Sequence, residues 1–242
     1  MQQEQAGLVA QMHNATQHTR GLREYVSGNL WNVDCVCVLS RIGKVAAAAT
    51  ATTLIERFGV THILFTGVAG SADPDVRVGD IVVGEQLVQH DIDASPLFPR
   101  FEVPLTGRSH FSSDEILTGR LMQAAGDFIA HDFQQTVAAT DRDIFRLHSP
   151  NLHRGLIASG DEFVNDKTRL FALREALPAL LAVEMEGAAV AQVCAEFDVP
   201  FAVIRTISDT ADEHAPMNFM QFIDRVAARY AFGIVRRLCS VT

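Results

Sequence analysis

Two short stretches in the last third of the chain carry side chains that could transfer protons and bind hydroxyl groups. They read Val183-Glu-Met-Glu-Gly187 and Arg205-Thr-Ile-Ser-Asp209, and each lies where an apolar, strand-like run ends. Strands of this kind are buried on both faces of a parallel sheet, so side chains at their ends fall in the crevice at its carboxyl edge. Carboxylates there are typical of groups that move protons.

The same residues also fit an ordinary structural explanation. Glu186 stands where it could open a helix over 187–197, and Ser208 or Asp209 could cap the turn that follows. Spacing alone does not choose between a reactive site and two helix caps, so both alternatives stay open at this point.

Length and composition indicate the class of protein. The chain has 242 residues, is 48% hydrophobic and carries a formal charge of −9, which fits one domain and argues against nucleic-acid or anionic-membrane partners. No apolar run approaches the roughly 18–20 residues of a membrane span, and no signal peptide begins the chain. The four cysteines lack zinc-like spacing. We expect a cytoplasmic protein that handles a small ligand.

Strand-like and helix-like segments alternate along the chain. We expect strands at 34–40, 62–66, 80–83 (extending towards 90), 155–158, 180–183 and 200–207, and helices at 44–58, 113–130, 167–177, 189–197 and 219–239. This alternation predicts an α/β fold, a single-domain three-layer αβα sandwich with a mixed, mainly parallel central sheet. The proline-containing stretch 91–113 is expected to cover a substrate or to form an interface.

Two glycine-containing corners follow predicted strands. Thr66-Gly-Val-Ala-Gly70 could bring backbone N–H groups close to a phosphate or a ribose, with Ala69 and Gly70 beside the ligand, or could simply make a turn. Spacing favours the turn. In Ser40-Arg-Ile-Gly-Lys44, the two cations could receive an anion at a helix start or remain solvated.

A third corner, Ser159-Gly-Asp-Glu-Phe163, ends in an aromatic residue. Phe163 could stack on a flat heterocycle, which is worth roughly 1–3 kcal/mol, or fill the core. His90-Asp-Ile-Asp93 has no third ligand nearby, so we predict no metal. Neither a G-x-S-x-G nor an H-E-x-x-H motif is present, which argues against serine hydrolases and zincins.

Six segments in order resemble the nucleoside phosphorylase superfamily, and most closely its 5′-methylthioadenosine/S-adenosylhomocysteine nucleosidases. The segments are Ser40-Arg-Ile-Gly-Lys-Val-Ala-Ala47, Thr66-Gly-Val-Ala-Gly70, Val78-Gly-Asp-Ile-Val-Val83, Ser159-Gly-Asp-Glu-Phe163, Val183-Glu-Met-Glu-Gly-Ala188 and Val203-Ile-Arg-Thr-Ile-Ser-Asp209. Each is weak alone, but together they extend over nearly the whole chain. The resemblance implies the superfamily's fold and hydrolysis of an N-glycosidic bond, releasing adenine and a 5-thioribose without a cofactor.

By this resemblance, three residues would carry the reaction. Asp209 would hand a proton towards N7 of the purine, Ser208 would help to place it, and Glu4 would orient the attacking water. Cleavage builds negative charge on the leaving base, so a positioned acid matters most. Such an aspartate must be protonated, which burial favours by raising its pKa.

The resemblance also implies the residues that bind the substrate. Glu186 would accept hydrogen bonds from the ribose 2′- and 3′-hydroxyls, with Met185 packed on the sugar and Arg205 nearby. The base would meet Phe163, the backbone of Val164 and the aromatic wall at Phe219.

Two departures from the family pattern stand out. The family opens with a strand just before the glutamate that aligns with Glu4, whereas Met1 stands close to that point, so we expect the chain to lack the first strand. Our hypothesis is a truncated chain or a start assigned too late; a stop codon directly upstream would contradict it. Val68 and Arg41 stand where the nucleosidases carry serine and glycine.

Two alternatives to hydrolysis remain at this point. One is a purine or methylthioadenosine phosphorylase, for which Arg41 could help to hold phosphate. The other is a non-catalytic nucleoside-binding protein. The family further implies a homodimer, while the sequence leaves the 5′ substituent of the substrate open.

Overall fold

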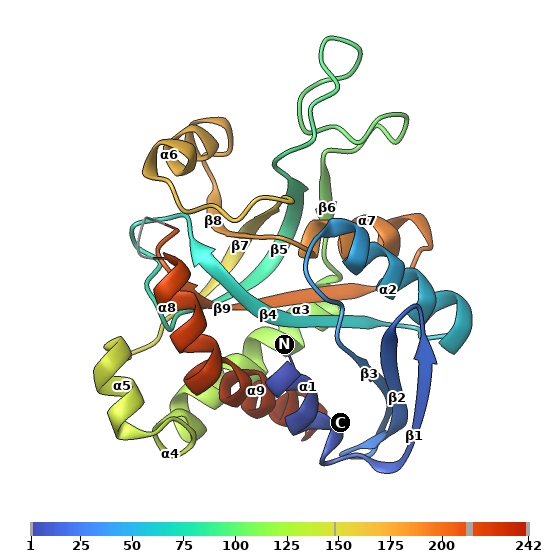
Figure 1. Cartoon of the computed structure of the whole chain (residues 1–242), viewed down its shortest axis with the longest axis vertical. Coiled ribbons are helices and arrows are strands. Elements are labelled where there is room, and N and C mark those ends of the chain that lie inside the picture. The colour runs from blue at the N-terminus through green and yellow to red at the C-terminus, as the bar shows by residue number, and fades with distance from the viewer. Residues whose placement is uncertain (1, 148, 212–214, 241–242) are drawn as a thin grey trace.

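The computed structural model describes residues 2–147, 149–211 and 215–240. Its main sheet has the strand order β6-β5-β7-β8-β4-β9, and β9 also pairs with β5, which closes a ring of strands. The strands are β4 (Ile63–Ser71), β5 (Ile81–Gln89), β6 (His110–Ser112), β7 (Leu152–Ser159), β8 (Leu180–Glu184) and β9 (Phe201–Asp209) (Figure 1). The β4–β9, β5–β7 and β7–β8 pairs are parallel and the others antiparallel, which confirms the predicted mixed sheet.

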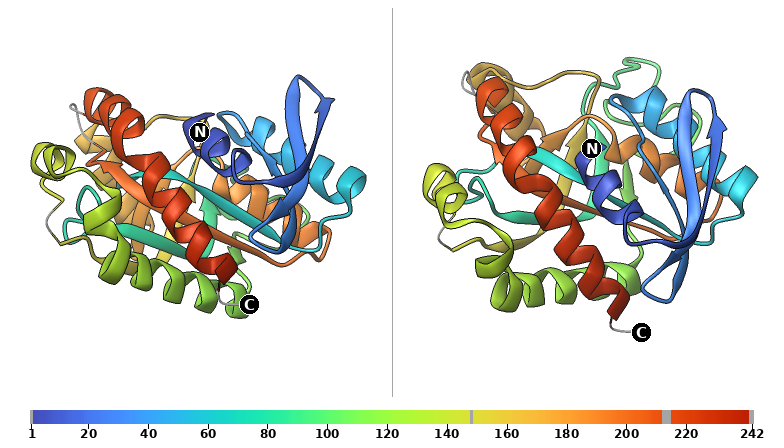
Figure 2. Two further views of the ribbon diagram at one scale, coloured as in Figure 1. Left: turned by 90° about the horizontal axis from the view of Figure 1, so that it is seen from below. Right: turned by 60° about the horizontal axis from the view of Figure 1, so that its bottom comes forward.

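Helices cover both faces of this sheet (Figure 2). They are α1 (Gln2–Val9), α2 (Lys44–Phe58), α3 (Glu115–Asp127), α4 (Phe133–Thr136), α5 (Ala139–Phe145), α6 (Lys167–Ala176), α7 (Gly187–Glu196), α8 (Ala215–Phe222) and α9 (Ala228–Ser240). Helices α2 and α7 pack into one apolar cluster with the strands, and α3 and α9 into a second. The predicted αβα arrangement is therefore confirmed. In the described ranges, no helix is long and apolar enough to cross a membrane.

Two predicted helices continue further than a single α-helix. The π-helical turn η1 (Phe128–Asp132) carries α3 into α4, and η2 (Ile223–Ala227) joins α8 to α9. The amphipathic pattern over 219–239 therefore holds across the turn, because each π-turn keeps apolar side chains such as Phe128 and Val226 in the core.

A separate antiparallel sheet precedes α2. It contains β1 (His13–Arg20), β2 (Arg23–Leu30) and β3 (Val33–Val38), of which the sequence predicted only the last. Strand β1 is polar and almost wholly exposed, so it lacks the alternation that reveals a half-buried strand. Trp31 and Asn32 connect β2 to β3 with φ values of 49° and 67°, as a two-residue type I′ turn requires.

The segment Thr66-Gly-Val-Ala-Gly70 is not a turn, and the prediction that spacing favoured was wrong. These residues continue strand β4, which reaches Ser71. Instead, the glycines leave room for side chains of the neighbouring strand β9. A Cβ atom at Gly70 would lie 2.8 Å from Asp209 Oδ1, and one at Gly67 would lie 3.4 Å from an Arg205 guanidinium nitrogen. Glycine is required where two buried side chains approach a strand this closely.

The stretch between β5 and β6 forms the irregular loop that its prolines predicted. It projects from one end of the molecule, beyond the sheet (Figure 1). Leu97 and Leu105 are 83% and 91% exposed there, whereas Phe101 and Val103 are buried. The loop is therefore anchored by part of its apolar surface and presents the rest to its surroundings.

Candidate functional site

A cavity of about 660 Å3, called the reaction pocket below, lies where strands β4, β8 and β9 end. Gly70 of β4 pairs with Val183 of β8 on one side and with Asp209 of β9 on the other, so the register brings the two sequence motifs together. Of the residues expected at the site, those that line it are Ala69, Gly70, Phe163, Val164, Met185, Glu186, Arg205, Asp209 and Phe219.

Asp209 ends the fully buried strand β9 and is itself 2% exposed. Its Oδ2 accepts a hydrogen bond of 2.7 Å from the hydroxyl of Ser208, and its Oδ1 accepts one of 2.9 Å from the amide of Ala211. Ser208 is fully buried behind the pocket wall and does not line the pocket. Asp209 therefore fits both explanations offered by the sequence. Its carboxyl group lines the pocket, and it also accepts a hydrogen bond from the following turn.

Glu186 faces the pocket from the amino end of α7 without capping that helix. Its Oε1 accepts a hydrogen bond of 2.8 Å from the amide of Gly43, a residue at the start of α2 with φ of 95°. Burial, followed by repulsion from Glu184, raises the pKa of Glu186 to about 7. A carboxylate in this position can accept hydrogen bonds from hydroxyl groups of a ligand and changes charge near neutral pH.

Glu184, rather than Glu186, is the carboxylate that caps α7. Its two oxygens accept hydrogen bonds from the amides of Glu186 and Gly187, at 3.1 Å and 2.9 Å, and from the Ser159 hydroxyl. The helix-cap explanation was thus correct for the segment but assigned to the wrong acid. Because Glu184 satisfies the orphan amides, the side chain of Glu186 remains available to the pocket.

Glu184 also forms an ion pair with Arg205, whose guanidinium group lies beside the pocket. The Arg205 Nη2 atom lies 2.8 Å from Glu184 Oε2, and the side chains are only 2% and 3% exposed. Arg205 further donates to the carbonyls of Phe65 and Ile204 and stands 4.3 Å from the centroid of the Phe65 ring. The sequence placed Arg205 at the site but gave no sign of this buried pair, whose partner precedes it by one strand.

Two aromatic rings that line the pocket pack against each other. Phe163 and Phe219 meet edge to face, with centroids 5.5 Å apart at 74°. Phe163 is 38% exposed, so it does not fill the core as the alternative interpretation held. Buried Val164 and half-buried Met185 complete this side. A flat apolar ligand can pack against this wall, in the pocket that Asp209 also lines.

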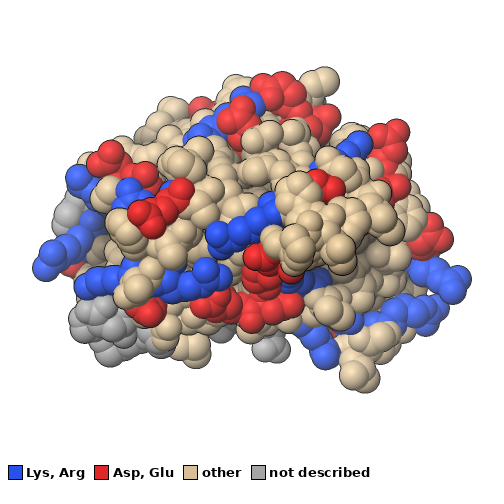
Figure 3. Space-filling view, turned by 90° about the horizontal axis from the view of Figure 1, so that it is seen from above, with Lys and Arg blue, Asp and Glu red and all other residues tan. Residues whose placement is uncertain are grey.

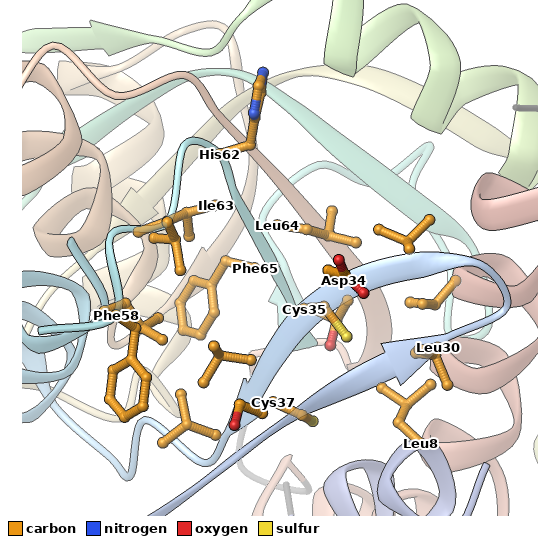
Figure 4. A pocket seen from close by; sticks show the side chains of 18 of the residues that line it. Leu8, Leu30, Asp34, Cys35, Cys37, Phe58, His62, Ile63, Leu64 and Phe65 are labelled. Carbon is orange, nitrogen blue, oxygen red and sulfur yellow. The ribbon is translucent and has the colours of Figure 1, made fainter. Parts of the chain in front are cut away.

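Two expected residues lie apart from this cluster or turn away from it. Glu4, in α1, is buried and lines a different cavity, of about 890 Å3 between β3 and β4, called the slot below (Figure 4). Arg41 lines the reaction pocket, but its guanidinium donates to the carbonyl of Leu22 at the turn between β1 and β2. Arg205 is already paired, so among the described residues neither arginine of the pocket presents a guanidinium free of protein partners.

No group of three or more His, Cys, Asp or Glu side chains in the described ranges could hold a metal ion. On the face seen in Figure 3, acidic and basic side chains lie beside one another and neither sign forms a continuous field.

Known proteins resemble this chain over nearly all of its length. Residues 1–240 match the family model described as the phosphorylase superfamily. The chain is 38% identical to a 5′-methylthioadenosine/S-adenosylhomocysteine nucleosidase of Anoxybacillus flavithermus, over 94% of this chain and 90% of that protein. The enzyme of the same name from Neisseria meningitidis, solved with methylthio-immucillin-A, superposes with a TM-score of 0.86 at 31% identity, covering 100% and 96% of the two chains. Futalosine hydrolase of Helicobacter pylori gives 0.84 at 33%, covering 100% and 95%.

Proposed function

This chain belongs to the phosphorylase superfamily, and from that premise we propose that it hydrolyses the N-glycosidic bond of adenosine derivatives with a 5′-thioether. The products are adenine and a 5-thioribose. The observation that carries this proposal is that Glu186 and Asp209 line one pocket together with the aromatic pair Phe163 and Phe219.

Asp209 acts as the general acid in this proposal. As the bond from ribose to base breaks, its electrons pass to the base, and a proton delivered to N7 neutralises the leaving group. The Ser208 hydroxyl and the Ala211 amide each occupy one oxygen of Asp209 and so fix its orientation. A proton donor held in this way loses little entropy on reaching the transition state.

Glu186 binds and stabilises the ribose. Its carboxylate accepts hydrogen bonds from the 2′- and 3′-hydroxyls, while its negative charge opposes the positive charge that develops on the sugar. The amide of Gly43 and the cap formed by Glu184 hold Glu186 from two sides. Met185 packs on the sugar, and Phe163, Val164 and Phe219 enclose the base.

Water is the nucleophile in this proposal, with Glu4 as the residue that orients it. A phosphorylase would require cations or N–H donors for phosphate, and the two guanidinium groups of the pocket are already bound to protein oxygens. That observation favours hydrolysis over phosphorolysis. Glu4 lines the neighbouring cavity between β3 and β4 rather than the reaction pocket, so this role requires water to pass between the two cavities, which share Phe65 and Thr66.

We further propose a cytoplasmic homodimer. Ile42 and Val45, at the start of α2, are 74% and 81% exposed, and the projecting loop adds exposed Leu97 and Leu105. Ile42 also lines the reaction pocket, so a second copy on this surface would close the 5′ side of the substrate site. Sedimentation would show a single species of twice the chain mass, and a monomer at micromolar concentration would contradict the dimer.

Asp209→Asn tests the assignment of the general acid. Asparagine keeps the size of the side chain but cannot donate an acidic proton, so we expect turnover of 5′-methylthioadenosine to fall about 1,000-fold or more. Calorimetry on the same variant should show that it still binds the substrate. Unchanged turnover would refute the assignment. Futalosine belongs in the same assay, because a futalosine hydrolase is among the similar structures.

A further inference from the structure

Hydrogen bonds join three segments of the chain beside the reaction pocket. They connect Lys44 at the start of α2, Asp91 just after β5 and Asp161 just after β7, and these three residues are called the polar triangle below. The amide of Lys44 donates to Asp161 Oδ1 at 2.8 Å, and the amide of Asp161 donates to Asp91 Oδ2 at 2.9 Å. The Lys44 ammonium group completes the triangle, 2.6 Å from Asp91 Oδ1. Each of the three residues is therefore bound to both of the others.

The ion pair of the polar triangle is partly shielded from water. The side chains of Lys44 and Asp91 are only 17% and 25% exposed, and the Lys44 ammonium group also donates to Gln89 Oε1 at 2.9 Å. Although burial opposes it, the hydrogen bonds from Lys44 and from the amide of Asp161 hold the pKa of Asp91 below its ordinary value. Asp91 is therefore a fixed negative charge that holds the turn after β7 to the start of α2.

The turn that carries Asp161 is also attached to the sheet through its backbone. The amide of Gly160 donates to the carbonyl of Glu184 at 3.1 Å, and the amide of His90 donates to the carbonyl of Ser159 at 2.9 Å. A Cβ atom at Gly160 would lie 2.3 Å from the His90 ring, so the turn rests directly on that ring. Backbone groups thus fix the turn to β5 and β8, while the Asp161 side chain fixes it to α2.

The residues next to the polar triangle belong to the proposed substrate site. Gly43, which precedes Lys44, donates its amide to Glu186 Oε1 at 2.8 Å. Phe163, two residues after Asp161, lines the pocket as part of its aromatic wall. The polar triangle therefore connects the segment that contacts the ribose-binding carboxylate to the segment that carries the base-stacking ring.

Gly43 depends on its surroundings for its conformation. Its φ is 95°, in a region that glycine enters freely and leaves as freely, and it has no side chain to cap α2. Asp161 accepts the amide of Lys44, the first residue of α2, and so caps the helix from a distant segment. Holding the Lys44 amide also limits the directions in which the preceding Gly43 amide can point.

We propose that Asp161 is a positioning residue for the reaction: held by Asp91, it fixes the start of α2 so that the Gly43 amide stays on Glu186. This inference rests on the proposed function, in which Glu186 binds the ribose. Neither Asp161 nor Asp91 lines the reaction pocket, so Asp161 acts through Gly43 and Glu186 rather than on the substrate.

The sign of a pKa change at Glu186 distinguishes this role from a simple effect of charge. Burial and Glu184 raise the pKa of Glu186 to about 7, and the hydrogen bond from the Gly43 amide opposes that rise. Loss of this hydrogen bond would raise the pKa further, whereas removal of the Asp161 charge alone would lower it. The other ionisable side chains that line the pocket stay unchanged in every variant: Arg41, Glu162, Glu184, Arg205, Asp209 and Asp224.

Carbon NMR of the Glu186 carboxyl group, in protein labelled at glutamate, measures this pKa without substrate. The signal is assigned by its absence in Glu186→Gln. Asp161→Ala removes the acceptor of the Lys44 amide, and Asp161→Asn removes the charge but keeps an acceptor oxygen. The matched control is Asp166→Ala, because the exposed Asp166 carboxylate accepts an amide at 2.8 Å in the same way, at the start of α6.

The titration midpoint should lie near pH 7 in the wild-type chain and rise by about 0.5 to 1 pH unit in Asp161→Ala. Asp161→Asn should return it to the wild-type value or below, and Asp166→Ala should leave it unchanged. An unchanged or lowered midpoint in Asp161→Ala would overturn the proposal. An equal rise in Asp166→Ala would overturn it as well, because the loss of any helix cap would then explain the shift.

Steady-state kinetics measure the consequence for the reaction. The value of kcat/KM for 5′-methylthioadenosine should fall about tenfold or more in Asp161→Ala and recover to within about threefold of wild type in Asp161→Asn. Equal losses in these two variants would contradict the role of the acceptor oxygen. If the wild-type chain releases no adenine, the proposed function fails, whereas the carboxyl titration still decides whether Asp161 positions Glu186.

Discussion

The reaction pocket and the slot are neighbours that share four lining residues, Leu39, Ser40, Phe65 and Thr66, yet they are built in opposite ways. Around the pocket, buried polar groups hold one another: Glu184 alone joins Arg205, Ser159 and the start of α7. Around the slot, most of the lining side chains are apolar. We therefore propose the smaller cavity as the reactive one, because reactivity requires preorganised polar groups rather than volume.

The comparison also explains which parts of the molecule should respond to substitution. Polar groups of the pocket are buried and mutually dependent, so losing one leaves another without a partner. Some side chains of the slot, such as Leu64 and Phe65, are only half-buried and border open space. Substitutions in the pocket should therefore cost more than comparable substitutions in the slot.

Glu184→Gln is expected to have the largest effect. It leaves the Arg205 guanidinium buried without a counter-charge, and breaking such a pair costs about 3–5 kcal/mol. Urea denaturation would measure the loss. Asp34→Asn is the matched change in the slot, where the exposed Asp34 carboxylate accepts only from Asn29, and it should change stability by less than about 0.5 kcal/mol. Similar losses in the two variants would remove the contrast between the regions.

Glu186→Gln should affect activity rather than stability. The amide cannot oppose the positive charge on the ribose, so kcat/KM for 5′-methylthioadenosine should fall by about 100-fold. The control is Glu162→Gln, since Glu162 also lines the pocket but is paired with half-buried Arg169. Steady-state kinetics would compare them. An equal loss in the control would mean that any charge at the rim suffices.

Alanine substitution of one residue in β9 and one in β4 compares side-chain packing in the two strands. Ile204 in β9 is 3% exposed, so Ile204→Ala should cost about 2–5 kcal/mol. Half-buried Leu64 in β4 faces the slot, and Leu64→Ala should cost about 1–2 kcal/mol less, because the site is already partly open. Chemical denaturation gives both values. A greater loss at Leu64 would show that the edge of β4 is packed as tightly as the interior.

The last comparison is the pH dependence that Glu186 contributes. Its folded pKa is raised to about 7, above the ordinary value of 4.5, so the folded state binds the proton more tightly than the unfolded state. This contribution to stability is fully present below 4.5 and is lost as pH rises through about 7. Ribose binding should depend on pH in the opposite direction. KM should increase as pH falls below about 7, because the carboxylate of Glu186 is then protonated.

Glu186→Gln provides the control for both pH profiles. The variant has no titrating group at this position, so its KM should lose the change near pH 7, and its stability should lose the corresponding slope. A wild-type KM that stays constant from pH 8 to pH 6 would contradict the raised pKa that burial and Glu184 give to Glu186.

Sequence predicted the elements whose patterns are strong and local. Helix α2 was placed at its observed bounds, and β8 and β9 were found from uninterrupted apolar runs. Strand β1 was missed, because its exposed polar residues carry no pattern and only pairing with β2 makes it a strand. The glycines of β4 were misinterpreted for a related reason: their purpose is to clear Asp209 and Arg205, which come from a strand far along the chain.

The candidate site was predictable in its residues but not in its connections. The motifs identified Glu186, Asp209 and the aromatic pair, all of which line one pocket. No spacing rule reveals that Glu184 would cap α7 and bind Arg205, since that arrangement depends on the register between strands. One sequence pattern agrees with the observed cap: Glu184 stands three residues before Gly187, the first residue of an apolar helix run.

The most direct test of the central claim is product analysis after incubating the chain with 5′-methylthioadenosine, with and without phosphate. The account predicts free adenine and 5-methylthioribose in equal amounts in both mixtures, because water is the proposed nucleophile and the guanidinium groups of Arg41 and Arg205 both donate to protein oxygens. A sugar 1-phosphate formed only with phosphate would contradict hydrolysis and identify a phosphorylase. Binding without release of adenine in either mixture would contradict the claim that the pocket is catalytic.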